Sequence, residues 1–138
     1  MLLWRDKLKL IDLYNSVKEQ YLDVVVLMKS GNFYITYNND ALILNYLLHY
    51  KKINDKVGFP LSALKTVENK LNEKSISYIV AEEKEDIKQN NNYYIYMQKA
   101  NENLIIDNMC ANLLNKIKEK VAENFDNYKQ IKEYIDEL

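Results

Sequence analysis

Few side chains in this sequence have the type and spacing to do chemistry, and the most suggestive are two aromatic residues beside a glycine. The stretch SGNFYITY places Phe33 and Tyr34 just after Gly31, one of only two glycines in 138 residues. A glycine there is typical of a tight turn. An aromatic side chain beside a turn can pack into a core or stack on a nucleic-acid base. Both alternatives stay open for Phe33 at the level of sequence.

Lysines on either side of this stretch are the second candidate feature, because lysine ammonium groups bind phosphates. Lys29, Lys51, Lys52 and Lys56 could meet a duplex backbone, although four scattered lysines are also typical of a solvated surface. No metal-ligand spacing accompanies them, and two glycines cannot supply a phosphate-binding glycine loop. We therefore expect a protein that is not an enzyme and that needs no cofactor or metal.

Composition indicates an ordinary globular protein of one-domain size, with 48% apolar and 28% charged residues. The formal net charge of −1 gives no general attraction to nucleic acid. Cys110 is the only cysteine, so an internal disulfide is excluded. Charges at Arg5, Asp6 and Lys7 interrupt the start of the chain, and no apolar run reaches membrane-spanning length. We expect a cytoplasmic protein without membrane contact.

Apolar periodicity predicts the elements that position these residues. In chain order we expect a helix over 3–21, strands over 23–29 and 33–37 in a hairpin, a helix over 40–51 capped by Asn39, a loop over 52–58, a helix over 62–74, a strand over 76–81, a mobile loop over 82–92, a strand over 93–97, and helices from about 102 with a break or kink at 124–127. This order predicts an α/β (α+β) fold with a mixed β-sheet flanked by helices. We expect a domain over 1–100 and a helical C-terminal extension over 101–138, packed on it or on a partner.

Two longer stretches carry the pattern of a known family. YNSVKEQYLDVVVLMKSGNFYITYNNDA resembles the start of the mismatch-recognition domain of MutS, the DNA mismatch-repair protein. The matching residues are Tyr14, Lys18-Glu19-Gln20-Tyr21, Asp23, Gly31, Phe33-Tyr34 and Asp40-Ala41. VGFPLSALKTVENKLNEKSISYIVAEE resembles that family's Ala-Gly-Val-Pro turn with the helix and strand that follow, and it places Gly58 and Pro60 on the turn. The resemblance covers roughly residues 10–84.

The resemblance implies a role for Phe33. The family's Phe wedges into the minor groove and stacks on a mispaired base, which kinks the duplex most easily at a mismatch. The family's Glu, two residues further on, hydrogen-bonds the same base. Ile35 stands at that Glu position and Asn32 replaces an Asp. The chain therefore keeps the stacking group and lacks the contact to the base edge.

These observations leave two hypotheses. The first is a non-catalytic module that binds duplex or mismatched DNA, with Phe33 as the wedge and with candidate contacts from Tyr34, Lys29, Lys51, Lys52 and Lys56. The second is a protein–protein interaction or structural module of the same fold, with the C-terminal helices as a surface for a protein partner or a homodimer. The exposure of Phe33, and the presence of lysines around it, distinguish the two.

Overall fold

The chain folds into six helices and five strands over residues 3–81 and 83–138, which a computed structural model describes. The elements are α1 (Leu3–Gln20), β1 (Val25–Ser30), β2 (Phe33–Tyr37), α2 (Asn38–Leu48), β3 (Lys56–Pro60), the short 3-10 helix η1 (Leu61–Ala63), α3 (Leu64–Glu73), β4 (Tyr78–Val80), β5 (Lys84–Asp86), α4 (Tyr93–Glu123) and α5 (Asp126–Glu137). They form two compact units, residues 1–101 and residues 102–138, which are described separately.

The strands of the first unit form one mixed sheet in the order β3-β2-β1-β4-β5. β1 and β4 are parallel, and the other neighbouring strands are antiparallel. Ser30 pairs with Phe33 and Met28 with Ile35, so β1 and β2 form the hairpin that the sequence predicts around Gly31. The predicted α+β fold class, with helices against a mixed sheet, is confirmed.

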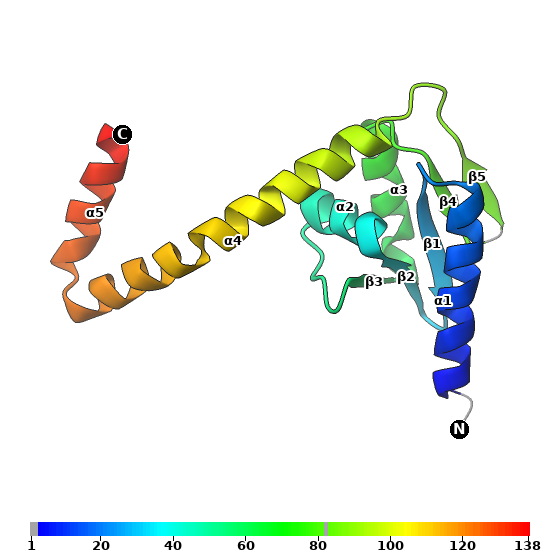
Figure 1. The fold of residues 1–138 in the computed structure, drawn as a ribbon, viewed down its shortest axis with the longest axis horizontal. Coiled ribbons are helices and arrows are strands. Elements are labelled where there is room, and N and C mark those ends of the chain that lie inside the picture. Colours follow the sequence, from blue (N-terminus) through cyan, green and yellow to red (C-terminus); the bar gives the residue numbers. More distant parts are fainter. Residues whose placement is uncertain (1–2, 82) are drawn as a thin grey trace. The chain divides into compact units, whose positions relative to one another are not determined.

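Helices cover both faces of this sheet. α2, α3 and the first turns of α4 pack on one face over a large core that includes Leu27, Ile43 and Phe59. α1 packs alone on the other face over a smaller core that includes Tyr14 and Met28 (Figure 1). Five strands span about 19 Å, whereas one helix is about 10–12 Å wide. A groove therefore lies on each side of α1.

One predicted loop is partly wrong, because its second half is an edge strand. Gly58 and Pro60 lie inside β3 and not in a turn, and β3 pairs with β2 along its whole length. Val57 and Phe59 are buried against the main core, which is the alternating pattern of a strand. Pro60 is tolerated because it ends an edge strand, where a missing N–H leaves no ladder bond unmade.

Residues 83–97 also differ from the prediction, and Glu82 of the predicted loop lies outside the described residues. The segment expected to be a mobile loop contains β5, and its end is fixed where the side chain of Asn91 bonds backbone groups of Ser77 and Asp23. The YYIYM segment is not a strand but the start of α4, because Tyr93 and Ala100 are buried at helical spacing. Asn39 is not a cap. Tyr37 occupies the cap position of α2 without a side-chain hydrogen bond.

The second unit is a helical hairpin. It consists of α4 from residue 102 onward, a break at residues 124–125, and α5. The predicted helices after residue 102 and the break near Asn124 are confirmed.

The backbone at Gly31 generates the first testable prediction. Gly31 has φ +58°, a left-handed conformation that costs an L-residue with a Cβ about 1 kcal/mol. Gly58 is the matched control, since an added Cβ there would meet only ordinary contacts at 3.7 and 3.8 Å. Urea unfolding should show Gly31→Ala less stable by about 1 kcal/mol and Gly58→Ala nearly unchanged. Equal stability of the two variants would contradict the assigned turn.

Candidate nucleic-acid interface

Phe33 lies at the tip of the β1–β2 hairpin and is exposed. It is the first residue of β2, between Ser30 of β1 and Pro60 of β3 in the register of the sheet. Of its surface, 52% is accessible to solvent, in contrast to the buried Phe59. The core alternative for Phe33 is therefore excluded, and its ring is available to a partner.

Tyr34 lies on the opposite face of the same strand and is partly buried. Its ring packs against Phe59 with centroids 5.7 Å apart, and Tyr50 stacks on the other side of this group at 5.6 Å from Phe59. This aromatic cluster fixes the strand directly behind Phe33. The exposed ring thus projects from a rigid platform.

The candidate lysines do not gather around Phe33. Lys29 pairs with Tyr34 and lies at the hairpin, on the opposite face from Phe33. Lys56 pairs with Tyr37 at the far end of β2, about 13 Å from Phe33 at 3.3 Å per residue. Lys51 and Lys52 belong to the segment that leads into β3 at that far end, and Lys52 forms an exposed ion pair with Asp55 at 3.1 Å.

The end of the sheet that carries Phe33 has little excess positive charge. β1 and β4 are parallel, so the turn after β4 lies at the same end of the sheet as the hairpin tip. That turn contributes the exposed Glu83, and Lys84 beyond it is paired with Glu68. Among the described cations at this end of the sheet, Lys29 forms no ion pair.

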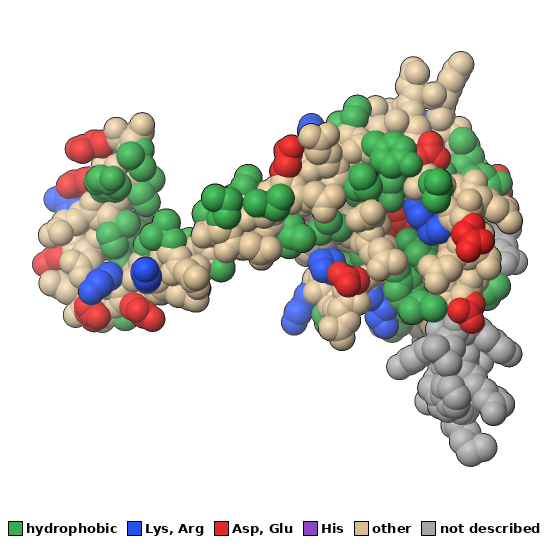
Figure 2. Space-filling view, viewed as in Figure 1, with side chains coloured by type: hydrophobic (Ala, Val, Ile, Leu, Met, Phe, Trp, Pro, Cys, Tyr) green, Lys and Arg blue, Asp and Glu red, His purple; other side chains and the backbone are tan. Residues whose placement is uncertain are grey.

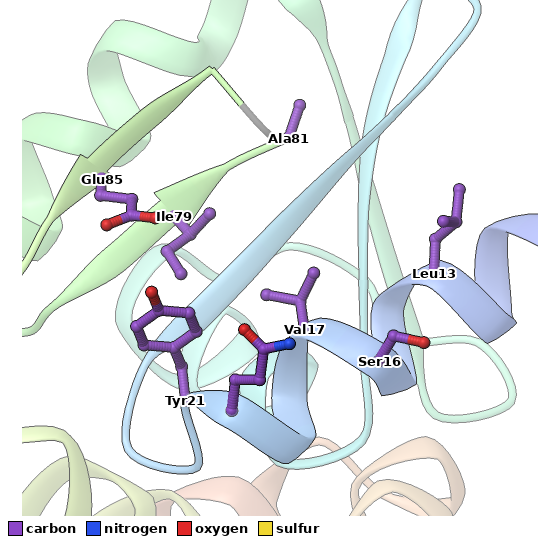
Figure 3. A pocket seen from close by; sticks show the side chains of 8 residues that line it. Leu13, Ser16, Val17, Tyr21, Ile79, Ala81 and Glu85 are labelled. Carbon is purple, nitrogen blue, oxygen red and sulfur yellow. The ribbon is translucent and has the colours of Figure 1, made fainter.

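Behind Phe33, the same face of β2 continues into one of the two grooves beside α1. Ile35 and Tyr37 line this groove of about 350 Å³, together with Leu10, Ile11, Ser30, Ile53, Asn54 and Lys56. Ile35 therefore presents an apolar surface at the position where the family pattern has a carboxylate. The second groove, of about 300 Å³, lies on the other side of α1, where Tyr21 extends toward Ile79 and Glu85 (Figure 3).

A buried carboxylate fixes the junction between β2 and α2. Asp40 is inaccessible to solvent and accepts four hydrogen bonds. The donors are the hydroxyls of Tyr14 at 2.6 Å and Tyr93 at 2.5 Å, the ammonium of Lys18 at 3.0 Å and the backbone N–H of Val26 at 3.1 Å. Three helices and the central strand therefore meet at one side chain, three residues after β2 ends.

Charge and burial act against each other in this cluster. Burial raises the pKa of the Asp40 carboxyl, whereas Lys18 and the two tyrosine hydroxyls act to lower it. Burial, with the charge of Asp40 beside it, raises the pKa of the hydroxyls of Tyr14 and Tyr93. Lys18 also donates to the carbonyl of Val24 at 2.6 Å, so its ammonium is paired as well. The polar groups of the cluster find their hydrogen-bond partners within it, which is typical of a cluster with a structural role.

The fold and this hairpin define an α+β domain that presents an aromatic side chain from a hairpin tip at one end of a mixed sheet. The family model of MutS domain I matches residues 9–134, and the chain belongs to that family. The match extends past residue 84, where the resemblance seen in the sequence ends, and includes most of the C-terminal hairpin. A search of the curated proteins finds no match.

Within residues 3–81 and 83–138, no three His, Cys, Asp or Glu side chains come together in a group that could hold a metal ion. None of the helices in the same ranges combines the length and the apolar run that a membrane crossing requires.

Sequence reasoning missed the role of Asp40. In the sequence it stood only as part of the family pattern. Asp40 lies in the first turn of α2, and its carboxylate is turned inward and bonds residues up to 53 positions away. The available signal was the Asp40-Ala41 pair within the family pattern, because an acidic residue followed by buried Ala41, Leu42 and Ile43 has no exposed helix face to occupy.

Replacing Asp40 tests this cluster. The Asp40→Asn variant should lose about 3–5 kcal/mol of stability, because the part-buried ammonium of Lys18 keeps its charge without an anionic partner. Asp55→Asn is the matched control, since it removes only the exposed pair with Lys52 and should change stability by less than about 1 kcal/mol. Denaturant unfolding measures both. Similar losses in the two variants would show that Asp40 is not a central tie.

Alkaline pH should destabilise the protein through the same cluster. The folded state keeps protons on Tyr14 and Tyr93 that the unfolded chain releases above pH about 10. Their contribution is therefore complete below pH 10 and falls as the pH rises further, by about 1.4 kcal/mol per pH unit for each tyrosine. Tyr93→Phe should remove about half of the pH slope that Tyr14 and Tyr93 produce together. Tyr94→Phe changes an exposed neighbouring residue and should leave the slope unchanged. Urea unfolding between pH 9 and pH 11, at roughly half-unit steps, compares the slopes; identical slopes for all three proteins would contradict the assignment.

Proposed function

We propose that the chain is a non-catalytic, cytoplasmic module that binds duplex DNA at mismatched positions by inserting Phe33 into the base stack. The observation that carries this proposal is the exposure of a phenyl ring at a rigid hairpin tip, in a chain of the MutS domain I family. An aromatic side chain inserted between bases partly unstacks them and bends the duplex. A mismatch lowers the free-energy cost of unstacking and bending the duplex. Phe33 should therefore insert preferentially at mismatched positions.

The side chain at residue 35 limits how the base is read. Ile35 has no donor or acceptor and faces an apolar groove, so no hydrogen bond from it reaches a base edge. Selectivity then comes from the ease of deforming the duplex rather than from the identity of the mispaired base. We expect similar affinity for mismatches of similar flexibility.

The charge distribution predicts weak binding that depends on salt. Lys29 lies at the hairpin but on the face opposite Phe33, whereas Lys56 lies about 13 Å away along the strands, roughly four base-pair rises, and Lys51 and Lys52 precede it in the chain. With so few phosphates neutralised, the salt dependence of affinity should have a shallow slope, and the affinity itself should be low at physiological salt.

The second hypothesis, an interaction module of the same fold, has separate support. The hairpin of residues 102–138 contains no buried residue, although it carries large apolar side chains. That feature concerns a different surface from Phe33. A protein contact there is compatible with DNA contact at the β1–β2 hairpin.

Binding by variants at Phe33 tests the proposed function. In anisotropy titrations at low salt, Phe33→Ala should weaken binding to a mismatched duplex by about 1–3 kcal/mol, the worth of one base–aromatic stack. Phe33→Trp should retain most of the affinity because it keeps a stacking surface. Ile53→Ala is the matched control, since it shortens another exposed apolar side chain near the lysines at the far end of β2.

The outcomes separate the alternatives. If the wild type binds and Phe33→Ala binds equally well, Phe33 is not the wedge. If the folded wild type binds no duplex at low salt, the DNA proposal fails and the interaction hypothesis remains.

A further inference from the structure

The helical hairpin of residues 102–138 has an apolar surface without a core. Eleven of its large apolar side chains are exposed, and no residue of the hairpin is buried. Figure 2 shows hydrophobic side chains gathered on both α4 and α5. An isolated helix of 12 residues, the length of α5, is marginal in water unless an amphipathic face is packed. The hairpin therefore needs a covering surface.

On α4, eight apolar residues form one stripe, and Leu104 lies outside it on the other half of the helix. At 100° per residue they occupy about half of the helix circumference, whereas Asn108, Asn115 and Glu119 lie on the opposite half. We call this set the α4 stripe: Ile105, Ile106, Met109, Cys110, Leu113, Leu114, Ile117 and Val121. Its length of 17 positions corresponds to about 25 Å.

α5 covers only the C-terminal part of the α4 stripe. The two helices enclose an apolar groove of about 200 Å³ lined by Ile117 and Val121 of α4 and by Tyr128, Ile131, Lys132 and Ile135 of α5. These contacts involve only the last part of the stripe. Met109 and Leu113, further toward the N-terminus of α4, remain 75% and 57% exposed.

We propose that a second copy of this chain covers the surface, with the two α4–α5 hairpins packed as a four-helix bundle. At about 100 Å² for each of the ten exposed side chains other than Leu104, the surface amounts to roughly 1,000 Å². A standard interface needs about 800 Å² from each partner, and a typical monomer exposes an apolar patch of only about 300–600 Å². The hairpin thus carries enough apolar area for a stable dimer.

Charge makes the same surface complementary to itself. Residues 116–120 of α4 carry three lysines and one glutamate, a net charge of +2. α5 carries four acidic residues and two lysines, a net charge of −2. A twofold axis that places α4 of one copy against α5 of the other brings these opposite charges together twice. This symmetry favours a second copy over a partner of one charge sign.

The oligomeric state of the full chain tests the proposal. In sedimentation equilibrium at about 50 μM, the wild type should have twice the 16.4 kDa mass of the chain. The Met109→Glu/Leu113→Glu double variant should be monomeric, with its dimer Kd raised about 100-fold or more, because each buried, unpaired carboxylate costs at least a factor of ten. Asn108→Glu/Asn115→Glu adds the same charge to the polar side of α4 and should stay dimeric.

Two measurements on the wild type complete the test. Its Tm should rise with protein concentration, as for any fold that gains stability by association. Cys110, within the α4 stripe, should react more slowly with a thiol reagent as the dimer forms, and this locates the interface. A monomeric wild type with a concentration-independent Tm, or a dimer that persists unchanged in the Met109→Glu/Leu113→Glu variant, would overturn the proposal.

Discussion

The buried carboxylate of Asp40 is the constraint on which the N-terminal unit depends. A charge removed from water costs several kcal/mol unless its lone pairs are satisfied. The required donors come from α1, from the start of α4 and from the backbone of β1, so these elements can pack only in an arrangement that brings them to one point. Apolar burial on the two faces of the sheet supplies the bulk of the stability. The need to satisfy this carboxylate selects the arrangement of the helices.

This arrangement leaves one aromatic ring exposed on a rigid support. Asp40 holds the end of β2, the Tyr34–Phe59 contact holds its middle, and pairing with Ser30 and Pro60 holds its start. Phe33 is therefore presented with little loss of freedom on binding, which favours insertion into a stack. Because Ile35 offers no polar group, the proposed insertion of Phe33 would depend on how easily a duplex opens and not on which base it holds. Recognition by deformability is the function that we propose for this geometry.

The sequence predicted the hairpin, the α+β class and most helices, because those depend on local turn chemistry and on apolar periodicity. It misassigned β3, since Gly58 and Pro60 resemble turn residues while the strand is stabilised by pairing with β2, which no local signal records. It read residues 93–97 as a strand from their β-branched and aromatic composition, whereas the burial of Tyr93 against Asp40 favours a helix. The sequence placed Phe33 correctly in a strand but could not decide its exposure, which depends on tertiary packing that no local signal records.

The most direct test of the proposed interface is a map of backbone amide shifts on adding a mismatched duplex to 15N-labelled protein. The hairpin tip and the lysines of residues 51–56 lie at opposite ends of β2, so the map can distinguish them. The account predicts the largest changes at residues 29–34 and at Leu61, whose N–H is bonded to Asn32 at the tip. Changes confined to residues 51–56 or to the C-terminal hairpin, with the β1–β2 tip unaffected, would contradict it.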